Sequence, residues 1–206
     1  MKAIFCAAVV LLFLSACSSS ELTPEAQLSA KALAEESAKV EKNPSRETAL
    51  RSAGFKSVAA GNAGAYMNRQ SSALRAALRG AKGIAFSRRG FDIILTMQSA
   101  HLFNGGDIAV KPGFRPVLKR IANVLIEYDR TKVTLTGYTD SNGWDKFNQS
   151  LSEFRADSIA QDLRTSGVPP IRIAVEGAGE ASPIASNASF SGRATNNRIV
   201  LTISAL

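Results

Sequence analysis

Arg155 occupies a position in this chain where an arginine is costly. The stretch from residue 151 to residue 163 has helical periodicity, and at about 100° per residue its apolar side chains form one arc: Leu151, Phe154, Ile159 and Leu163. Arg155 falls in the middle of this arc, four residues from Leu151 and from Ile159. A guanidinium that faces a protein core is unfavourable unless an anionic partner compensates its charge. The pattern therefore predicts an acidic partner for Arg155.

Asp140 is the acid that the spacing indicates. It lies fifteen residues before Arg155, directly after a strand-like run from residue 133 to residue 139. We expect a cleft where the end of that strand meets the helix, with one acid and one base in it. The two charges could form a structural salt bridge, or they could grip a ligand that carries both charges. The pattern alone leaves both interpretations open.

The elements that would position this pair alternate between strands and helices. Apolar and alternating runs predict strands at 91–97, 131–139, 171–177 and 197–204. Besides the Arg155 helix, a second helix is predicted to begin at Lys111-Pro112-Gly113, with apolar side chains on one side up to Tyr128. This order is typical of an α/β fold in which helices pack on a sheet.

The N-terminus has the features of a bacterial lipoprotein leader. Lys2 is followed by an apolar run that is too short to span a bilayer, and small residues come next. The sequence Leu-Ser-Ala-Cys, which ends at Cys17, resembles the lipobox; the resemblance implies removal of residues 1–16 and acylation of Cys17. Ser18 follows, where an inner-membrane retention signal usually has Asp, so we expect the outer membrane and its periplasmic face.

Two further segments separate this leader from the α/β region. Residues 17–44 are polar and rich in Ala, Glu and Lys, which is typical of a solvated tether; as a flexible coil they average roughly 30 Å. Residues 45–85 have a helical pattern with Met67, Leu74 and Leu78 on one side. Basic residues on the other side are most simply a solvated face, although an envelope protein partner could bind there.

A set of residues at fixed spacing runs through the C-terminal half. They are Gly137-Tyr138-Thr139-Asp140, Gly143, Asn148, Leu151-Ser152, Arg155-Ala156, Gly167-Val168, Arg172-Ile173, Gly177-Ala178-Gly179-Glu180, Pro183, Asn187, Gly192-Arg193, Asn196 and Arg198. This pattern resembles the OmpA-like peptidoglycan-binding domain, the family of Pal-type and MotB-type domains. The resemblance implies a βαβαβ-β mixed sheet with helices packed on it for residues 86–206. Residues 64–70 are similar, more weakly, to lipoproteins of the YiaD type.

The resemblance also assigns roles to residues by position. The family binds the diaminopimelate of the peptidoglycan stem peptide, whose end carries one ammonium and one carboxylate. The matching positions imply that Asp140 accepts the ammonium and that Arg155 holds the carboxylate, for which its planar guanidinium is suited. Four more residues are implied at the site: Asn148, to orient Asp140 or bond the peptide; Leu151 and Phe103, as walls; and Arg193, to bond the ligand or the Asp140 loop.

Two positions depart from the family pattern. Tyr138 stands where the family usually has a histidine, and Asn197 stands where it usually has the first of two arginines. Neither is one of the two charges that would hold the ligand, but a degenerate domain with slight wall affinity stays an alternative. Arg198 is expected to bond loop carbonyls near the last strand.

Other kinds of functional site find little support. His101 is the only histidine, and after cleavage Cys17 is the only cysteine, so neither a second His nor a free Cys can complete a metal site. The sequence has no phosphate-binding glycine loop and no evident Ser/His/Asp arrangement. The formal net charge of +8, or +7 without Lys2, favours anionic wall or lipid groups over nucleic acid in a periplasmic protein. We expect no cofactor and no nucleic acid partner.

These features together predict a lipid-anchored outer-membrane protein that binds peptidoglycan non-covalently and ties the membrane to the wall. One alternative is a regulatory or assembly subunit of an envelope machine, in which the wall site is an anchor and residues 45–85 bind a partner. A second alternative is a wall-modifying enzyme, which needs a nucleophile, a metal or paired carboxylates that the pattern does not show. We therefore expect that the protein is not an enzyme.

Overall fold

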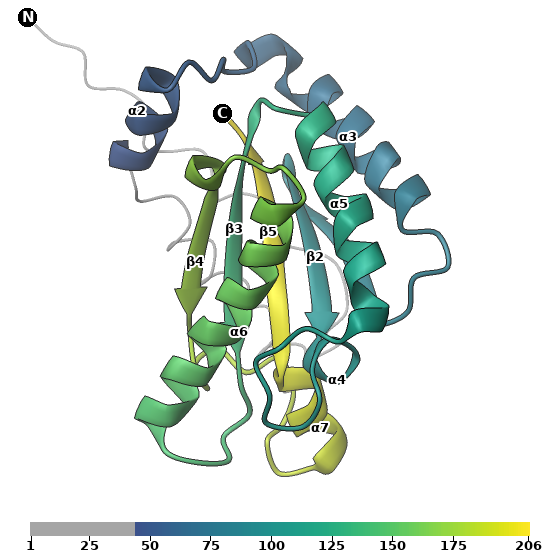
Figure 1. Ribbon diagram of the computed structural model, residues 1–206, viewed down its shortest axis with the longest axis vertical. Helices are drawn as coiled ribbons and strands as arrows, with labels where there is room; N and C mark the ends of the chain where they lie inside the picture. The colour runs from purple at the N-terminus through teal and green to yellow at the C-terminus, as the bar shows by residue number, and fades with distance from the viewer. Residues whose placement is uncertain (1–43) are drawn as a thin grey trace, which may run out of the picture.

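A five-stranded mixed sheet forms the centre of the fold (Figure 1). The computed structural model describes residues 44–206, so the predicted leader, Cys17 and the tether up to residue 43 lie outside the described residues. The strands are β1 (Ile84–Arg89), β2 (Asp92–Gln98), β3 (Thr131–Tyr138), β4 (Ile173–Gly177) and β5 (Arg198–Ala205). Their spatial order is β1-β2-β5-β3-β4; β3 and β4 are parallel, and the other neighbours are antiparallel. The predicted α/β mixed sheet is confirmed.

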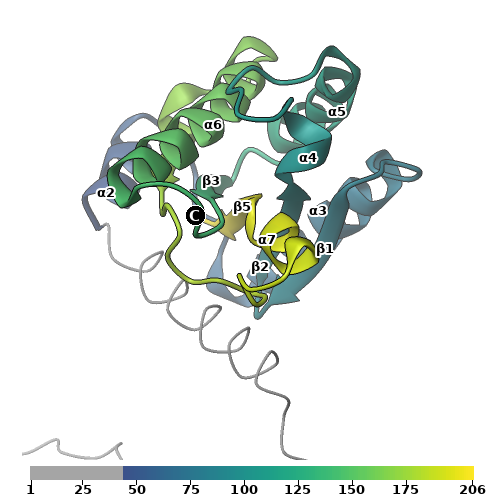
Figure 2. The same cartoon turned by 90° about the horizontal axis from the view of Figure 1, so that it is seen from below.

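The helices in the described residues are α2 (Pro44–Ser52), α3 (Ala63–Ala77), α4 (Ser99–Leu102), α5 (Arg115–Glu127), α6 (Asp145–Thr165) and α7 (Phe190–Asn196), with short 3-10 turns η1 (Ala60–Asn62), η2 (Pro112–Phe114) and η3 (Pro170–Arg172). The long helices α3, α5 and α6 cover one face of the sheet, and the short ones lie at its ends (Figure 1). Helix α6 packs on β3 and β4, α5 packs beside α6, and α3 packs against α5 (Figure 2). In residues 44–206 no helix is both long and apolar enough to cross a membrane.

Strand β3 is buried on both of its faces. On the helix side, Val133 and Leu135 join the main core, as their alternation predicts. On the other side Thr134 and Thr136 are also buried, and Tyr138 packs with Ile94 and Val200. The alternation of residues 131–139 is typical of a half-buried strand, and the burial of both faces of β3 contradicts that expectation.

The hairpin of β1 and β2 adds an edge strand that the sequence analysis did not predict. Arg89 pairs with Asp92 across a two-residue turn, and Gly90 in this turn has a φ of +56°. Such a conformation suits glycine, so the short turn before the predicted strand was a usable hairpin signal. Helix α3 then places Met67 and Leu74 in the main core, so the helical region and the sheet share one hydrophobic core.

Candidate functional site

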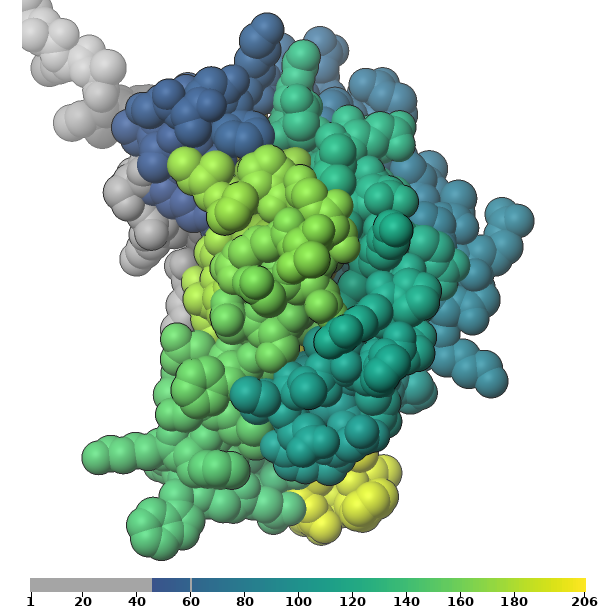
Figure 3. Space-filling view, in the orientation of Figure 1, coloured from purple at the N-terminus to yellow at the C-terminus, as the bar shows by residue number. Residues whose placement is uncertain are grey.

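The predicted site residues gather where β3 ends and α6 begins. In Figure 1 this is the lower end of the sheet, where the start of α6, the loop after α4, and α7 lie close together. Figure 3 shows the same end in space-filling form, with the start of α6 in green, the loop after α4 in teal and α7 in yellow. The segments that meet here are far apart in the sequence, and the mixed sheet brings them to one edge.

Two glycines allow α6 to approach the strand ends closely. A Cβ on Gly137 would overlap the carbonyl of Ser152, and one on Gly177 would lie 2.7 Å from the carbonyl oxygen of Gln149. The amide of Gln149 also donates to the Gly177 carbonyl (2.6 Å), and the Ser152 hydroxyl accepts from the backbone of Gly179 (2.9 Å). The first half of α6 is therefore fixed against β3 and β4, which places its side chains over the end of β3.

Asp140 is held by hydrogen bonds to both of its carboxylate oxygens. Oδ1 accepts from the backbone N–H of Asn142 at 2.7 Å, and Oδ2 accepts from Nδ2 of Asn197 at 2.6 Å. The side chain is half-buried, so it still meets solvent. Asn197 was counted only as a departure from the family pattern, yet it contacts the predicted ligand-binding acid directly. Its neighbourhood was not readable from sequence, because 57 residues separate the two partners.

Asn148 connects Asp140 to a second acid. Its Nδ2 donates to the backbone carbonyl of Asp140 (3.4 Å) and to Oε2 of Glu180 (3.2 Å). Asn148 thus orients the Asp140 loop, which is one of the two roles that the family pattern implied. Glu180 was quoted in that pattern but was not predicted at the site. Its position next to Asn148 makes this edge of the site more acidic than the sequence analysis expected.

Arg155 is buried, with an exposed fraction of 4%, and backbone carbonyls are its partners. Nη2 donates to the carbonyl of Gly105 at 2.6 Å, and Nε donates to that of Asp107 at 3.0 Å. Among residues 44–206 it forms no ion pair with Asp140, so the prediction of an acidic contact partner was wrong. Two uncharged acceptors compensate the guanidinium instead, since a charged donor makes strong hydrogen bonds to carbonyls.

One nitrogen of Arg155, Nη1, is not bonded within the described residues. Nη1 has no hydrogen-bond partner within the described part of the chain, and it is absent from the fully buried polar atoms that lack one, so it touches solvent. Burial lowers the pKa of Arg155, while the negative charges of Asp107 and Asp140 raise it. Asp140 is therefore close enough to act on Arg155 electrostatically without bonding to it.

Phe103 and Leu151, the two residues predicted to line the pocket, differ in how deeply they are buried. Phe103 is almost fully buried in the main core, and its ring lies beneath the guanidinium of Arg155, with Cζ 5.1 Å from the ring centroid. It supports Arg155 from the core side. Leu151 is half-buried on α6, one turn before Arg155. Both residues therefore lie next to Arg155, but Phe103 is 2% exposed and offers a ligand almost no surface.

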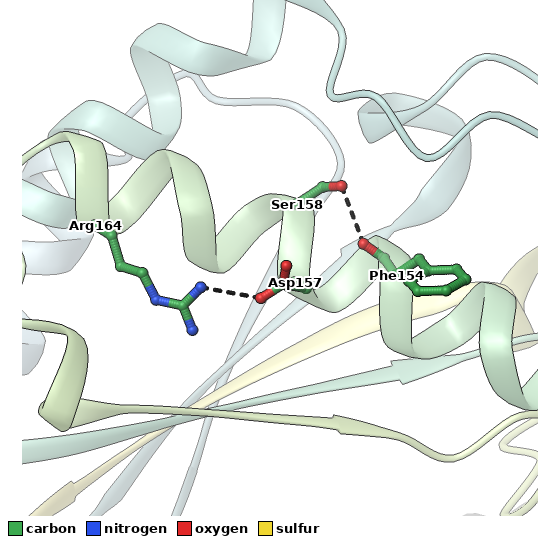
Figure 4. Close-up of polar contacts among 4 residues, drawn as sticks. All are labelled: Phe154, Asp157, Ser158 and Arg164. Carbon is green, nitrogen blue, oxygen red and sulfur yellow. Dashed lines mark hydrogen bonds and ion pairs between the residues drawn. The ribbon is translucent and has the colours of Figure 1, made fainter.

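Phe154 does not belong to the apolar arc that was predicted for this helix. It is 57% exposed, and the buried face of α6 consists instead of Asn148, Ser152, Arg155, Ala156, Ile159, Ala160 and Leu163. Ile159 and Leu163 of the predicted arc are buried as expected. The prediction was wrong for Phe154, because the close approach of the first half of α6 to the strand ends favours small and polar side chains there. On the outside of the same helix, Asp157 forms an ion pair with Arg164 at 3.0 Å (Figure 4).

Arg193 supports the loop before α7. Its Nη1 donates to the carbonyls of Asn187 (2.9 Å) and Ala188 (3.3 Å). No hydrogen bond joins it to the Asp140 loop, so its connection to the acid runs through the backbone: its carbonyl accepts from Asn197 at 3.4 Å. Helix α7 itself was not predicted, although Ser189 at its N-cap, which accepts from the Gly192 N–H, is a recognisable start signal.

Tyr138 and Arg198 form a stacked pair on the other face of the sheet. They are direct neighbours on β3 and β5, and Arg198 Cζ lies 3.7 Å from the centroid of the Tyr138 ring. Arg198 also donates to the carbonyls of Asn196 (3.1 Å) and Ser182 (3.0 Å), so the expectation that it bonds loop carbonyls is confirmed. Tyr138 replaces the usual histidine and is a stacking partner of this arginine.

The arrangement presents a carboxylate and a guanidinium that are near each other but not joined. Such a pair can bind a group that carries both an ammonium and a carboxylate, because each end finds its opposite charge. In the part of the chain that is described, no three His, Cys, Asp or Glu side chains are grouped so that they could hold a metal ion.

Comparison with known proteins gives a family and several relatives. Residues 102–197 match the OmpA family. The chain is 42% identical over 146 residues to "Probable lipoprotein YiaD" of Escherichia coli K12, which covers 71% of this chain and 66% of that protein. It is 38% identical over 109 residues to "Outer-membrane lipoprotein YfiB" of Pseudomonas aeruginosa, over 53% of this chain and 65% of YfiB. The chain therefore spans just under two thirds of the length of these two relatives.

A solved structure shares the fold. It is described as the cell wall anchor of the T6SS from Pseudomonas aeruginosa, and it matches with a TM-score of 0.58 and 29% identity. The match covers 65% of this chain and 95% of that chain. The two proteins thus share nearly the whole of the anchor's fold.

Proposed function

The chain carries an OmpA-family domain over residues 102–197 and is related to YiaD, as its residue pattern predicted, and we propose that it binds peptidoglycan non-covalently as a lipid-anchored outer-membrane protein. The diaminopimelate end of the stem peptide is the proposed ligand. No bond is made or broken in this function, so the protein is not an enzyme. Its relatives YiaD and YfiB are named as lipoproteins, and YfiB as one of the outer membrane, which supports the proposed location.

The free Nη1 of Arg155 beside Asp140 is the observation that carries this proposal. The nitrogen is held in place by the bonds of Nη2 and Nε, so it offers donors in a fixed direction to a ligand carboxylate. Asp140, fixed by Asn142 and Asn197, offers its remaining lone pairs to the ligand ammonium. Because both groups are already oriented, binding loses little side-chain entropy.

The position of α2 supports a bridge between membrane and wall. Arg46 on α2 donates from Nη2 to the carbonyls of Val133 and Arg172, each at 2.7 Å, near the starting ends of β3 and β4. Asp140 follows the other end of β3, seven residues later, which corresponds to about 23 Å along a strand. Helix α2, in which the described residues begin at Pro44, thus lies at the end opposite to the site, so a tether joined to Pro44 would attach at that end (Figure 1). A protein anchored in this way directs its site away from the membrane.

Titration of the mature chain with stem peptides tests the ligand. Cys17→Ser makes the chain soluble without altering residues 44–206. A peptide that contains diaminopimelate is compared with one that contains lysine, which lacks the second carboxylate. We expect the first to bind in the µM to mM range, about −4 to −8 kcal/mol, and the second to bind at least about tenfold more weakly. Equal affinities for the two peptides would contradict the role of Arg155.

Asp140→Asn removes the charge that is proposed to hold the ammonium while it keeps the size of the side chain. We expect at least about a tenfold loss of affinity and a matching loss of co-sedimentation with purified sacculi, because a charge-assisted bond becomes a neutral one. Asp145→Asn, at the exposed start of α6, is the matched control and should bind normally. If Asp140→Asn co-sediments as well as the unaltered protein, the site assignment is wrong.

A second candidate function is an assembly subunit of an envelope machine, with the wall site as its anchor. The similarity to the cell wall anchor of the T6SS favours this candidate. Its partner would bind the helical region, where Arg69 and Arg79 are exposed on and just after α3. Deletion up to residue 85 would remove Met67 and Leu74 from the core, so charge reversal is the cleaner test.

Arg69→Glu combined with Arg79→Glu separates the two candidates. A simple tether keeps sacculus binding and its envelope phenotype in cells, because the altered side chains are exposed and outside the residues assigned to the wall site. An assembly subunit keeps sacculus binding but loses the phenotype, since its partner can no longer dock. Loss of sacculus binding itself would show that the helical region belongs to the wall site, which neither candidate expects.

A further inference from the structure

Two large aromatic side chains stand in solvent at the rim of the site. Trp144 is 85% exposed and Phe147 is 62% exposed. Trp144 is the only tryptophan in the chain. Side chains of this size usually bury most of their surface, so two exposed rings three residues apart at the start of one helix point to a binding surface.

Trp144 and Phe147 lie at the start of α6, the helix that also carries Arg155. Trp144 is the N-cap residue of α6, and its carbonyl accepts from the backbone N–H of Asn148 at 2.9 Å. At about 100° per residue, positions 144, 147 and 151 fall within roughly 60° of one another around the helix. Arg155 lies one turn beyond Leu151 and about 40° further round. The rings therefore continue, along one side of the helix, the edge from which Arg155 reaches its ligand.

The charges around the rings argue against a membrane as their partner. Asp140 and Asp145 lie in the same loop and first turn, and Lys146 is the only basic residue from 140 to 154. Surfaces that bind anionic lipid headgroups carry clusters of Lys and Arg, and acidic side chains are repelled there. A neutral ligand with an apolar face is compatible with this environment.

We infer that Trp144 and Phe147 form a saccharide subsite, on which a sugar ring of the glycan strand stacks. The C–H face of a pyranose packs on an aromatic ring, and the hydroxyl groups at its edge stay in water. This inference rests on the proposed binding of the stem peptide by Asp140 and Arg155. It adds a second part to that site, which would read the sugar as well as the peptide.

The span from diaminopimelate to the sugar in the ligand is compatible with the separation of Asp140 and Trp144 in the protein. The two residues that join diaminopimelate to the muramic acid sugar span about 10 Å when extended. Trp144 is four residues from Asp140, so their Cα atoms are at most about 14 Å apart. A ligand held at Asp140 therefore places its sugar within reach of the rings without stretching.

Paired titrations separate the sugar from the peptide. The mature Cys17→Ser chain is titrated with a diaminopimelate tripeptide and with the same peptide attached to its N-acetylglucosamine–N-acetylmuramic acid disaccharide. We expect the disaccharide to tighten binding about three- to tenfold. Trp144→Ala and Phe147→Ala should each lose much of this gain while they keep the affinity for the bare peptide. Phe91→Ala, which removes an exposed ring at the other end of the sheet, is the matched control and should keep the gain.

The single tryptophan supplies an independent readout. Stacking removes Trp144 from water, so its fluorescence should shift to shorter wavelength with the disaccharide peptide, and clearly less with the bare peptide. The shift should persist in Phe91→Ala and weaken in Phe147→Ala. Analytical ultracentrifugation and phosphatidylethanolamine/phosphatidylglycerol vesicles test the two other occupants of such a surface, a second copy of the chain and a membrane.

The outcomes distinguish failure of the subsite from failure of the proposed function. If the protein binds the bare peptide but gains nothing from the disaccharide, or if Trp144→Ala keeps the gain, the subsite is wrong and the wall function stands. If it binds neither ligand, the proposed function fails and the subsite fails with it. A fluorescence shift with vesicles alone, or a dimer that Trp144→Ala dissociates, would also overturn the subsite.

Discussion

Two buried arginines lie at opposite ends of the sheet and serve different purposes. Arg172, in the turn before β4, is 1% exposed, and all three of its guanidinium nitrogens are bonded. It donates to the carbonyls of Leu125, Tyr128 and Thr131 at 2.6 to 2.9 Å, and to the Thr131 hydroxyl at 2.8 Å. Arg155 is about as deeply buried, but its Nη1 keeps unused donors. Burial of an arginine therefore does not identify a binding site; a held but unsatisfied donor does.

The carbonyls that accept hydrogen bonds from the two arginines also differ in their access to water. Leu125 and Thr131 are fully buried, so their carbonyls have no access to water if Arg172 is lost. Gly105 and Asp107, which accept from Arg155, belong to an exposed loop. Their carbonyls can turn to solvent, so we expect that Arg155 is replaceable for folding and, under the proposed function, not for ligand binding. This contrast predicts that one arginine controls stability and the other affinity.

Arg172→Met should produce the largest effect. It removes the Arg172 donors from the carbonyls of Leu125 and Thr131 and one of the two donors from that of Tyr128, which also accepts from the Thr131 hydroxyl. We expect a loss of about 3–5 kcal/mol in the free energy of unfolding. Urea denaturation measures this loss. The fraction that remains folded should still bind sacculi. A variant as stable as the unaltered protein would show that the bonds of Arg172 are not structural, and the contrast with Arg155 would fail.

Arg155→Met should have the opposite effect: a large loss of affinity and a small loss of stability. We expect at least about a tenfold loss of stem-peptide affinity with a stability loss of only about 1 kcal/mol, because its loop acceptors can rehydrate. Titration and urea denaturation of the same preparation give both numbers. Arg164→Met is the matched control on α6, since its ion pair with Asp157 lies on the outside of the helix and contributes little. A stability loss as large as that of Arg172→Met would mean that both arginines are structural.

Asn197→Ala should have an intermediate effect. It removes one of the two donors that orient Asp140, and we expect binding to weaken about three- to fivefold at nearly unchanged stability. Asn142→Ala is the control, because the other bond to Asp140 comes from the backbone N–H of Asn142 and survives the change. Equal affinities for the two variants would show that Asn197 does not position the acid.

Alkaline pH should slightly lower the free energy of unfolding through Tyr66, which lies near Arg172. Burial raises the pKa of Tyr66 above its ordinary value of 10.0, while the backbone N–H of Arg130, which donates to its hydroxyl at 3.1 Å, opposes this rise. The folded state therefore favours the neutral phenol, so this contribution to stability is present below about pH 10 and is lost as the pH rises through the folded pKa. Urea denaturation at pH 9 and pH 11 should show a smaller decrease in Tyr66→Phe. The same decrease in both proteins would exclude Tyr66 as the cause.

The sequence identified Arg155 because it breaks an apolar periodicity, but it could not name the partners of this residue. An acidic neighbour was the simplest expectation, whereas the structure supplies carbonyls from a loop about 50 residues away. Arg172 was quoted only within the family pattern, since no local periodicity marked it. Asn197 and Glu180 escaped prediction for the same reason: their contacts with Asp140 and Asn148 join segments that are distant in the chain.

Local patterns determined the strands β2 to β5, the helices α3, α5 and α6, and the family relationship, because periodicity and residue spacing are properties of neighbouring residues. The proposal that Asp140 and Arg155 are the two charges of the site also came from the sequence. Only the tertiary structure decided that these charges stay apart, that Nη1 of Arg155 has no hydrogen-bond partner among the described residues, and that Trp144 and Phe147 are exposed at the start of the same helix. Those features depend on which loops the sheet brings to one edge and on how closely α6 can approach Gly137 and Gly177.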